Sequence, residues 1–184
     1  MINLSRIAFE ITDHCNLDCV YCYNIWKMNG ATHKPFNSYK KATATLQQLF
    51  KQADIKSVAL TGGEPFLAER FLEIVLFCRM EGKQLTLISN GTQGKPSEYK
   101  QLLKMGVALF ELPIHSAQAA VHDRMTQRNG SWQKAEEEAG LWEKSVPAFC
   151  SSCAEWEKCK GGCRAASEQC FGSLGVEDPI LIIR

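Results

Sequence analysis

The stretch FEITDHCNLDCVYCYN, residues 9–24, joins the end of a β-prone segment to three cysteines spaced Cys15-x3-Cys19-x2-Cys22. Residues 7–12 are mostly apolar, aromatic or β-branched, which favours a short strand. Because the cysteines follow that strand directly, the sequence predicts a loop of thiols at its carboxyl end. The chain has 9 cysteines in 184 residues, so three of them at this close spacing are informative.

Length and composition describe a globular chain with no evident nucleic-acid or membrane partner. The 184 residues fit one domain plus a small appendage and are too few for an eight-unit β/α barrel of about 250 residues. Hydrophobic residues make up 45% of the chain, so a core can form. The net charge is +1, and the sequence has no block of like charge that would bind a phosphate backbone. Without a signal peptide or long apolar span, we expect a cytoplasmic protein whose clustered thiols bind metal.

Strand-like and helix-like segments alternate along the chain. The predicted strands are residues 7–12, 57–61, 85–89 and 108–114, and the predicted helices are residues 39–53, 68–80, 96–104 and 132–143, with a turn or short helix within residues 117–128. Ser38 is the expected N-cap of the first helix, and Cys78 is expected to be a buried core residue. The repeats predict the α/β class, here a partial parallel (β/α) barrel of about four units.

The first cysteine group has two interpretations from its residues alone. Three thiolates can hold three irons of a four-iron cluster and leave the fourth iron without a protein ligand. That iron could bind a small molecule and pass it an electron. The alternative is a structural zinc loop with a fourth ligand, for which His14 is adjacent. In a parallel β/α fold, this loop lies where ligands bind.

Residues 9–24 resemble the cluster loop of radical S-adenosylmethionine (SAM) enzymes, including the aromatic residue between the second and third cysteines. The resemblance implies that Cys15, Cys19 and Cys22 hold a 4Fe-4S cluster and that Tyr21 lies near the SAM adenine. It also implies catalysis, in which SAM is cleaved reductively to methionine and a 5'-deoxyadenosyl radical that abstracts hydrogen from a substrate. A reductant such as a flavodoxin or ferredoxin would supply the electron.

Later motifs support the resemblance. Gly62-Gly63-Glu64-Pro65, after the second predicted strand, is similar to the family's methionine-binding motif, in which glycines let the backbone approach a ligand closely. Asn90, after the third, would contact SAM or its surroundings. After the fourth, His115 and Ser116 would contact the ribose or the substrate, where many family members have serine and aspartate. A solvated loop histidine is the alternative for His115.

A second cysteine group begins where the composition changes near residue 146. It resembles the SPASM extension of peptide-modifying radical SAM enzymes, which carries auxiliary iron-sulfur clusters. We therefore expect domains at residues 1–145 and 146–184 and one auxiliary cluster, with zinc as the alternative. The family's last cysteine is absent, so a fourth ligand must come from elsewhere. The candidate ligands are Cys150, Cys153 and Cys159, with Cys163, Cys170 or Asp178 as the fourth.

The chain is also shorter than the family it resembles. Family members usually have six strands before the extension, whereas four are predicted here, so the fourth strand should be an exposed edge. The extension, a second protomer or a partner would cover that edge. The sequence therefore predicts a radical SAM enzyme acting on a peptide or protein. The alternatives are a catalytically impaired iron-sulfur pseudoenzyme and a zinc-stabilised interaction module.

Overall fold

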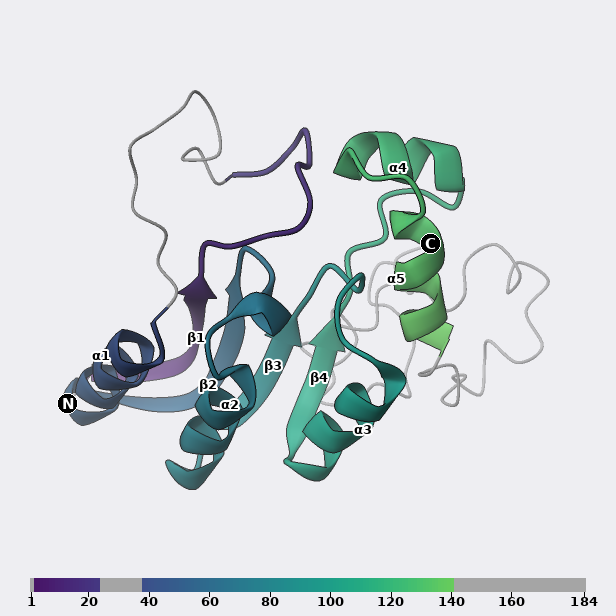
Figure 1. Cartoon of the computed structure of the whole chain (residues 1–184). Coiled ribbons are helices and arrows are strands. Elements are labelled where there is room, and N and C mark those ends of the chain that lie inside the picture. Colours follow the sequence, from purple (N-terminus) through teal and green to yellow (C-terminus); the bar gives the residue numbers. More distant parts are fainter. Residues whose placement is uncertain (1, 24–37, 141–184) are drawn as a thin grey trace, which may run out of the picture. The chain divides into compact units, whose positions relative to one another are not determined.

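The structure is a computed structural model that describes residues 2–23 and 38–140 (Figure 1). The chain divides into two units, Met1–Glu138 and Ala139–Arg184, and nearly all described residues belong to the first. The predicted domain boundary between residues 145 and 146 lies outside the described residues and stays a prediction. None of the described helices has the length and apolarity needed to cross a bilayer.

Within the described residues, four strands form one parallel sheet in the order β1-β2-β3-β4. The strands are β1 (Ile2–Thr12), β2 (Ala53–Gly62), β3 (Gln84–Ile88) and β4 (Val107–Glu111). The predicted α/β class, a partial parallel barrel of four strands, is confirmed. β1 and β2 begin earlier than their apolar runs predict because they pair from Ile2 and Ala53 onward, and backbone ladder bonds do not depend on side-chain pattern.

Each sheet strand is followed by helical structure. The helices are α1 (Tyr39–Gln52), the 3-10 turn η2 (Pro65–Leu67), α2 (Phe71–Met80), α3 (Pro96–Lys104), α4 (Ala119–Thr126) and α5 (Ser131–Gly140). Ser38 caps α1 as predicted, since its side chain accepts a hydrogen bond from the Lys41 amide. The second helix starts three residues later than predicted because Arg70 adopts a left-handed conformation, with φ 54°.

The core lies between the sheet and helices α1, α2 and α3, which cover one sheet face (Figure 1). One leucine or isoleucine from each helix, Leu46, Ile74 and Leu102, is at most 1% exposed. Each such side chain contributes about 1.5–3 kcal/mol by leaving water. Cys78 on α2 is also fully buried in this cluster, as predicted, and burial raises the pKa of its thiol to about 12.

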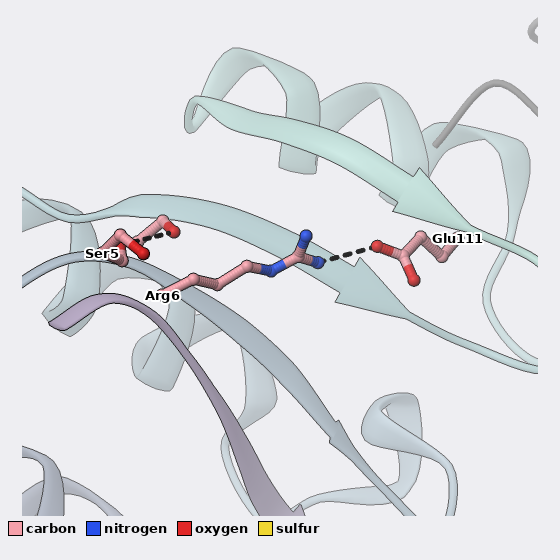
Figure 2. A network of polar contacts seen from close by, with 4 residues as sticks. Ser5, Arg6 and Glu111 are labelled. Atoms are coloured by element: carbon pink, nitrogen blue, oxygen red, sulfur yellow. Dashed lines mark hydrogen bonds and ion pairs between the residues drawn. The ribbon is translucent and has the colours of Figure 1, made fainter. Parts of the chain in front are cut away.

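The opposite face of the sheet carries a charged pair that spans its width (Figure 2). Arg6 on β1 and Glu111 on β4 form an ion pair with an N–O distance of 2.7 Å. In a flat sheet these outermost strands would lie about 14 Å apart, beyond the reach of the two side chains. The sheet is therefore concave on this face, as in part of a barrel.

The outermost strand β4 pairs with β3, and the described residues provide it with no second neighbour. This agrees with the expected exposed edge. At the other end of the sheet, β1 continues into residues 13–23, which we call the cysteine loop.

Candidate active site

The cysteine loop is joined at its start to the loop after β2. The Gly63 amide donates to the Thr12 carbonyl (2.7 Å), and the Glu64 amide donates to the His14 carbonyl (2.6 Å). A β-carbon at Gly63 would overlap the His14 carbonyl, and one at Gly62, where φ is +135°, would overlap the Thr12 carbonyl. Glycine is thus required here for the close packing of two loops.

The Glu64 side chain lies beneath these loops, with 0% of its surface exposed. Its Oε1 accepts hydrogen bonds from the Ser89 hydroxyl (2.9 Å) and the Phe66 amide (3.2 Å), and its Oε2 accepts one from the Asn90 amide (2.8 Å). Burial raises the pKa of this carboxyl to about 7, although the three hydrogen bonds lower it. Glu64 therefore connects the loops after β2 and β3 through a side chain hidden from solvent.

Asn90 extends this connection to the first cysteine. Its Nδ2 lies 3.8 Å from Cys15 Sγ and donates to Asn16 Oδ1 (3.0 Å). The Asn90 Oδ1 accepts hydrogen bonds from the amide and hydroxyl of Thr92, whose hydroxyl in turn accepts one from Asn16 Nδ2 (2.7 Å). The Leu17 amide donates to Cys15 Sγ (3.5 Å). Cys15 thus receives two N–H groups, which stabilise a thiolate or a cluster-bound sulfur.

The second cysteine is held from a different part of the chain. The Val20 amide donates to the Met125 carbonyl (2.9 Å), and the Asp18 amide donates to the Thr126 carbonyl (3.3 Å). Both amides flank Cys19, and both carbonyls lie in the last turn of α4. The Cys22 amide then donates back to the Cys19 carbonyl (3.1 Å), which closes a tight turn between these two cysteines.

Tyr21 packs against two histidines from the segment after β4. Its hydroxyl hydrogen-bonds His115 Nε2, and the two ring centroids are 4.2 Å apart. The His115 amide donates to His122 Nδ1 (3.2 Å), so a neutral His122 carries its proton on Nε2. Burial lowers the pKa of both histidines. Burial also raises the pKa of Tyr21, and a hydrogen bond with Cys19 raises it further.

Ser116 and Pro65 make local contacts at the edge of this site. The Ser116 hydroxyl accepts a hydrogen bond from the Gln118 amide (3.0 Å), and its carbonyl accepts one from Trp132 Nε1 (2.9 Å). Pro65 is buried at the start of η2. The structure therefore brings together predicted residues of four loops, while Ser116 forms its hydrogen bonds with the residue before α4 and with α5.

The chemistry of the donor set fits an iron-sulfur cluster. Cys15, Cys19 and Cys22 are half-buried thiols outside any disulfide, and electrostatic interaction with all three raises the pKa of Tyr21. In residues 2–23 and 38–140, no three Cys, His, Asp or Glu side chains converge closely enough to enclose a metal ion. In the same residues, therefore, neither the iron-sulfur cluster nor the zinc alternative with His14 has an assembled ligand set, and the chemistry of the three thiols supports the cluster.

Several contacts of this site were not predicted from the sequence. Asn16, Thr92, His122 and Asp123 each join segments of the site, although the sequence predicts no role for them. The available signals are the position of Asn16 directly after Cys15 and the pair His122-Asp123 in the polar stretch after the fourth predicted strand. The second cysteine group lies outside the described residues, so its ligand assignment stays a prediction; its members are Cys150, Cys153, Cys159, Cys163 and Cys170, with Asp178.

Known proteins are similar to this chain in sequence. AdoMet-dependent heme synthase of Methanosarcina barkeri is 29% identical over 138 residues, covering 73% of this chain and 38% of that protein. Antilisterial bacteriocin subtilosin biosynthesis protein AlbA of Bacillus subtilis is 28% identical over 131 residues, covering 68% and 27%. GTP 3',8-cyclase of Aquifex aeolicus is 29% identical over 135 residues, covering 68% and 40%. The chain thus spans 27% to 40% of the length of these relatives.

Solved structures share the fold. Streptococcus suis SuiB bound to the precursor peptide SuiA superposes with a TM-score of 0.58 at 17% identity, covering 76% of this chain and 31% of that chain. SuiB bound to S-adenosylmethionine gives a TM-score of 0.55, also at 17% identity, covering 77% and 31%. The sequence profile described as Radical SAM superfamily matches residues 9–150, which include the end of β1, the cysteine loop and the whole of β2, β3 and β4. The chain therefore belongs to the Radical SAM superfamily.

Proposed function

We propose that this chain is a SAM-cleaving radical enzyme, or the core of one, that modifies a peptide or protein. The observation that carries the proposal is the cysteine loop at the carboxyl edge of the sheet, where Cys15 receives N–H groups from Leu17 and Asn90. Membership of the Radical SAM superfamily implies a 4Fe-4S cluster and SAM. A peptide substrate is supported by the similarity to AlbA, a bacteriocin biosynthesis protein, and to SuiB bound to a precursor peptide.

Different residues of this chain would bind the cluster and SAM. Cys15, Cys19 and Cys22 would hold the cluster, and the backbone of Gly62 and Gly63 would lie beside the SAM methionine. Asn90 would fix Cys15 and contact SAM or its surroundings, while Tyr21 would lie near the adenine. When bound, the cluster and SAM supply a 5'-deoxyadenosyl radical and methionine, using one electron from a flavodoxin or ferredoxin.

Two further residues would complete the cofactor side of the site. His115, which contacts Tyr21, and Ser116, which follows it, would border the ribose or the substrate. The concave face of the sheet would hold the peptide. Residues 146–184 would carry one auxiliary iron-sulfur cluster, held by Cys150, Cys153 and Cys159 with a fourth ligand, or else a zinc ion. That extension, a second protomer or a partner would cover the edge of β4.

The test is anaerobic reconstitution of the full chain with iron and sulfide. We expect an electron paramagnetic resonance signal from a reduced 4Fe-4S cluster that changes when SAM is added, together with formation of 5'-deoxyadenosine. The Cys15→Ala variant should lose the SAM-responsive part of the signal and the formation of 5'-deoxyadenosine, while the signal of an auxiliary cluster would remain. Cys78→Ala is the matched control, because it also removes one thiol but from the buried core.

Two results would contradict the proposal. A chain that binds zinc and no iron with sulfide would support the interaction-module alternative. A chain that holds the cluster but never cleaves SAM would support the pseudoenzyme alternative. Because the chain spans less than half of its relatives, addition of a precursor peptide or of a GTP-like small molecule would separate the two substrate classes.

A further inference from the structure

The cysteine loop is attached to the fold at two separate places. The side of Cys15 is attached to the loops after β2 and β3, through the Gly63 and Glu64 amides and through Asn90. The side of Cys19 and Tyr21 is attached instead to residues 115–132, which we call the α4–α5 segment. The hydrogen bonds named above connect the two attachments through the loop itself and through the backbone bond between Ser89 and Glu111 at the sheet edge.

The attachment at Cys19 uses the end of a helix. The last carbonyls of a helix have no partner within it and must be satisfied elsewhere. In α4, the Met125 and Thr126 carbonyls accept hydrogen bonds from Val20 and Asp18. The cysteine loop therefore caps α4, and in return α4 fixes the backbone on both sides of Cys19.

The position of α4 depends on one carboxylate that does not touch the cysteine loop. Asp123 Oδ2 accepts from the Gly130 amide (2.6 Å), and Oδ1 accepts from the Ser131 hydroxyl (2.9 Å) and the Trp132 amide (2.9 Å). These bonds cap the start of α5 and close the turn between α4 and α5. The hydroxyls of Thr126 and Ser131, both at most 2% exposed, join the same turn (2.6 Å).

Other contacts of the α4–α5 segment point to the same conclusion. Trp132 donates its indole N–H to the Ser116 carbonyl, which holds the chain next to His115. The His115 ring forms a hydrogen bond with the Tyr21 hydroxyl, and the His115 amide donates a hydrogen bond to His122 Nδ1 on α4. Every contact between the α4–α5 segment and the cysteine loop named here therefore meets the loop between residues 18 and 21.

We infer that Asp123 is a positioning residue for Cys19 and Tyr21, acting through the α4 carbonyls and the two histidines and leaving the Cys15 attachment unaffected. This inference rests on the proposed function only in taking Cys19 as a cluster ligand. The physical reason is local. When the turn between α4 and α5 is lost, the Asp18 and Val20 amides lose their α4 carbonyl partners, and the His115 ring no longer supports Tyr21. The bonds that hold Cys15 come from other strands and stay intact.

The first experiment measures hydrogen exchange and thiol alkylation in the full, metal-free chain under reducing, anaerobic conditions. In Asp123→Ala, peptides covering residues 17–21 should gain exchange at the Asp18 and Val20 amides. Site-resolved alkylation of Cys19 should be about fivefold to thirtyfold faster, as expected for the loss of one to two net hydrogen bonds. Alkylation of Cys15 should change less than about twofold, because its attachment remains.

Two variants keep the test decisive. Asp123→Asn retains one acceptor oxygen for the start of α5, so its effect should fall between those of wild type and Asp123→Ala. Glu136→Gln is the matched control, since it removes a carboxylate from an exposed position of α5. Because these readouts need no cluster, failure of the proposed function would leave them unchanged.

The inference would be overturned by either of two results. One is equal acceleration of alkylation at Cys15, Cys19 and Cys78, which would mean general destabilisation rather than positioning. The other is unchanged exchange and alkylation in both Asp123 variants with the far-UV circular dichroism preserved. In reconstituted protein, Asp123→Ala should also release iron to a chelator faster than Glu136→Gln.

Discussion

The Glu64→Gln substitution tests whether the buried carboxyl beneath the cysteine loop is protonated in the folded chain below neutral pH. Burial raises the pKa of Glu64 from 4.5 to about 7. Between these two values the unfolded chain has ionised Glu64, whereas the folded chain keeps it neutral. The folded state therefore binds more protons, and its stability falls as the pH rises through this window. Glutamine has the same shape and no titration, so it removes this dependence.

The magnitude follows from the shift. At 1.36 kcal/mol per unit, a pKa of about 7 in place of 4.5 corresponds to about 3 kcal/mol. This stabilisation of the neutral form is complete below pH 4.5 and lost above pH 7, relative to a chain without the shift. About 2 kcal/mol of this stabilisation should be lost between pH 5.5 and pH 8. His115 and His122, whose pKa values burial lowers, titrate with the opposite sign but contribute equally to both proteins.

The assay is urea unfolding of the full, metal-free chain at several pH values, followed by far-UV circular dichroism. The difference in unfolding free energy between wild type and Glu64→Gln should fall by about 2 kcal/mol from pH 5.5 to pH 8. Glu136→Gln, which removes an exposed carboxylate, should show no such change. Parallel pH profiles of wild type and Glu64→Gln would refute the reasoning, because the hydrogen bonds to Glu64 would then fully offset the effect of its burial on the pKa.

Three other substitutions or modifications test the packing of the site and the sheet. Gly63→Ala should lower the free energy of unfolding by more than about 2 kcal/mol and reduce iron retention, because its β-carbon would overlap the His14 carbonyl. The control Gly82→Ala, whose β-carbon would meet no neighbour, should lower the free energy of unfolding by about 1 kcal/mol in the same urea assay. Cys78 should resist iodoacetamide at pH 8 until the chain unfolds, since burial raises the pKa of its thiol to about 12; rapid labelling in the folded state would contradict this. In a double-mutant cycle, Arg6→Met and Glu111→Gln should show a coupling below about 1 kcal/mol that weakens in salt, because both side chains are partly exposed.

The predicted elements were accurate where their cause is local. Apolar periodicity and Ser38 at a helix start depend on neighbouring residues, and the structure bears them out. Their boundaries were less accurate because partners decide them. β1 extends back to Ile2 because β2 begins at Ala53 beside it, and α2 begins late because Arg70 turns the backbone left-handed.

The roles of the site residues were only partly readable. The glycines at 62 and 63 were expected to make room for a ligand, and the structure shows that they also make room for the cysteine loop. Asn90 was expected near SAM, and its amide lies beside Cys15. His115 was expected at the substrate or in solvent, and it contacts Tyr21.

By itself, the sequence determined the α/β class, the sheet strands and the location of three thiols at a strand end, because hydrophobic period and cysteine spacing act over a few residues. Only the tertiary structure decided which distant residues hold that loop. Asn16 and Thr92 are 76 positions apart, and Tyr21 and His115 are 94 apart. Such pairs meet because parallel strands bring their carboxyl ends to one edge, and the details of register and loop path are set by the packed fold.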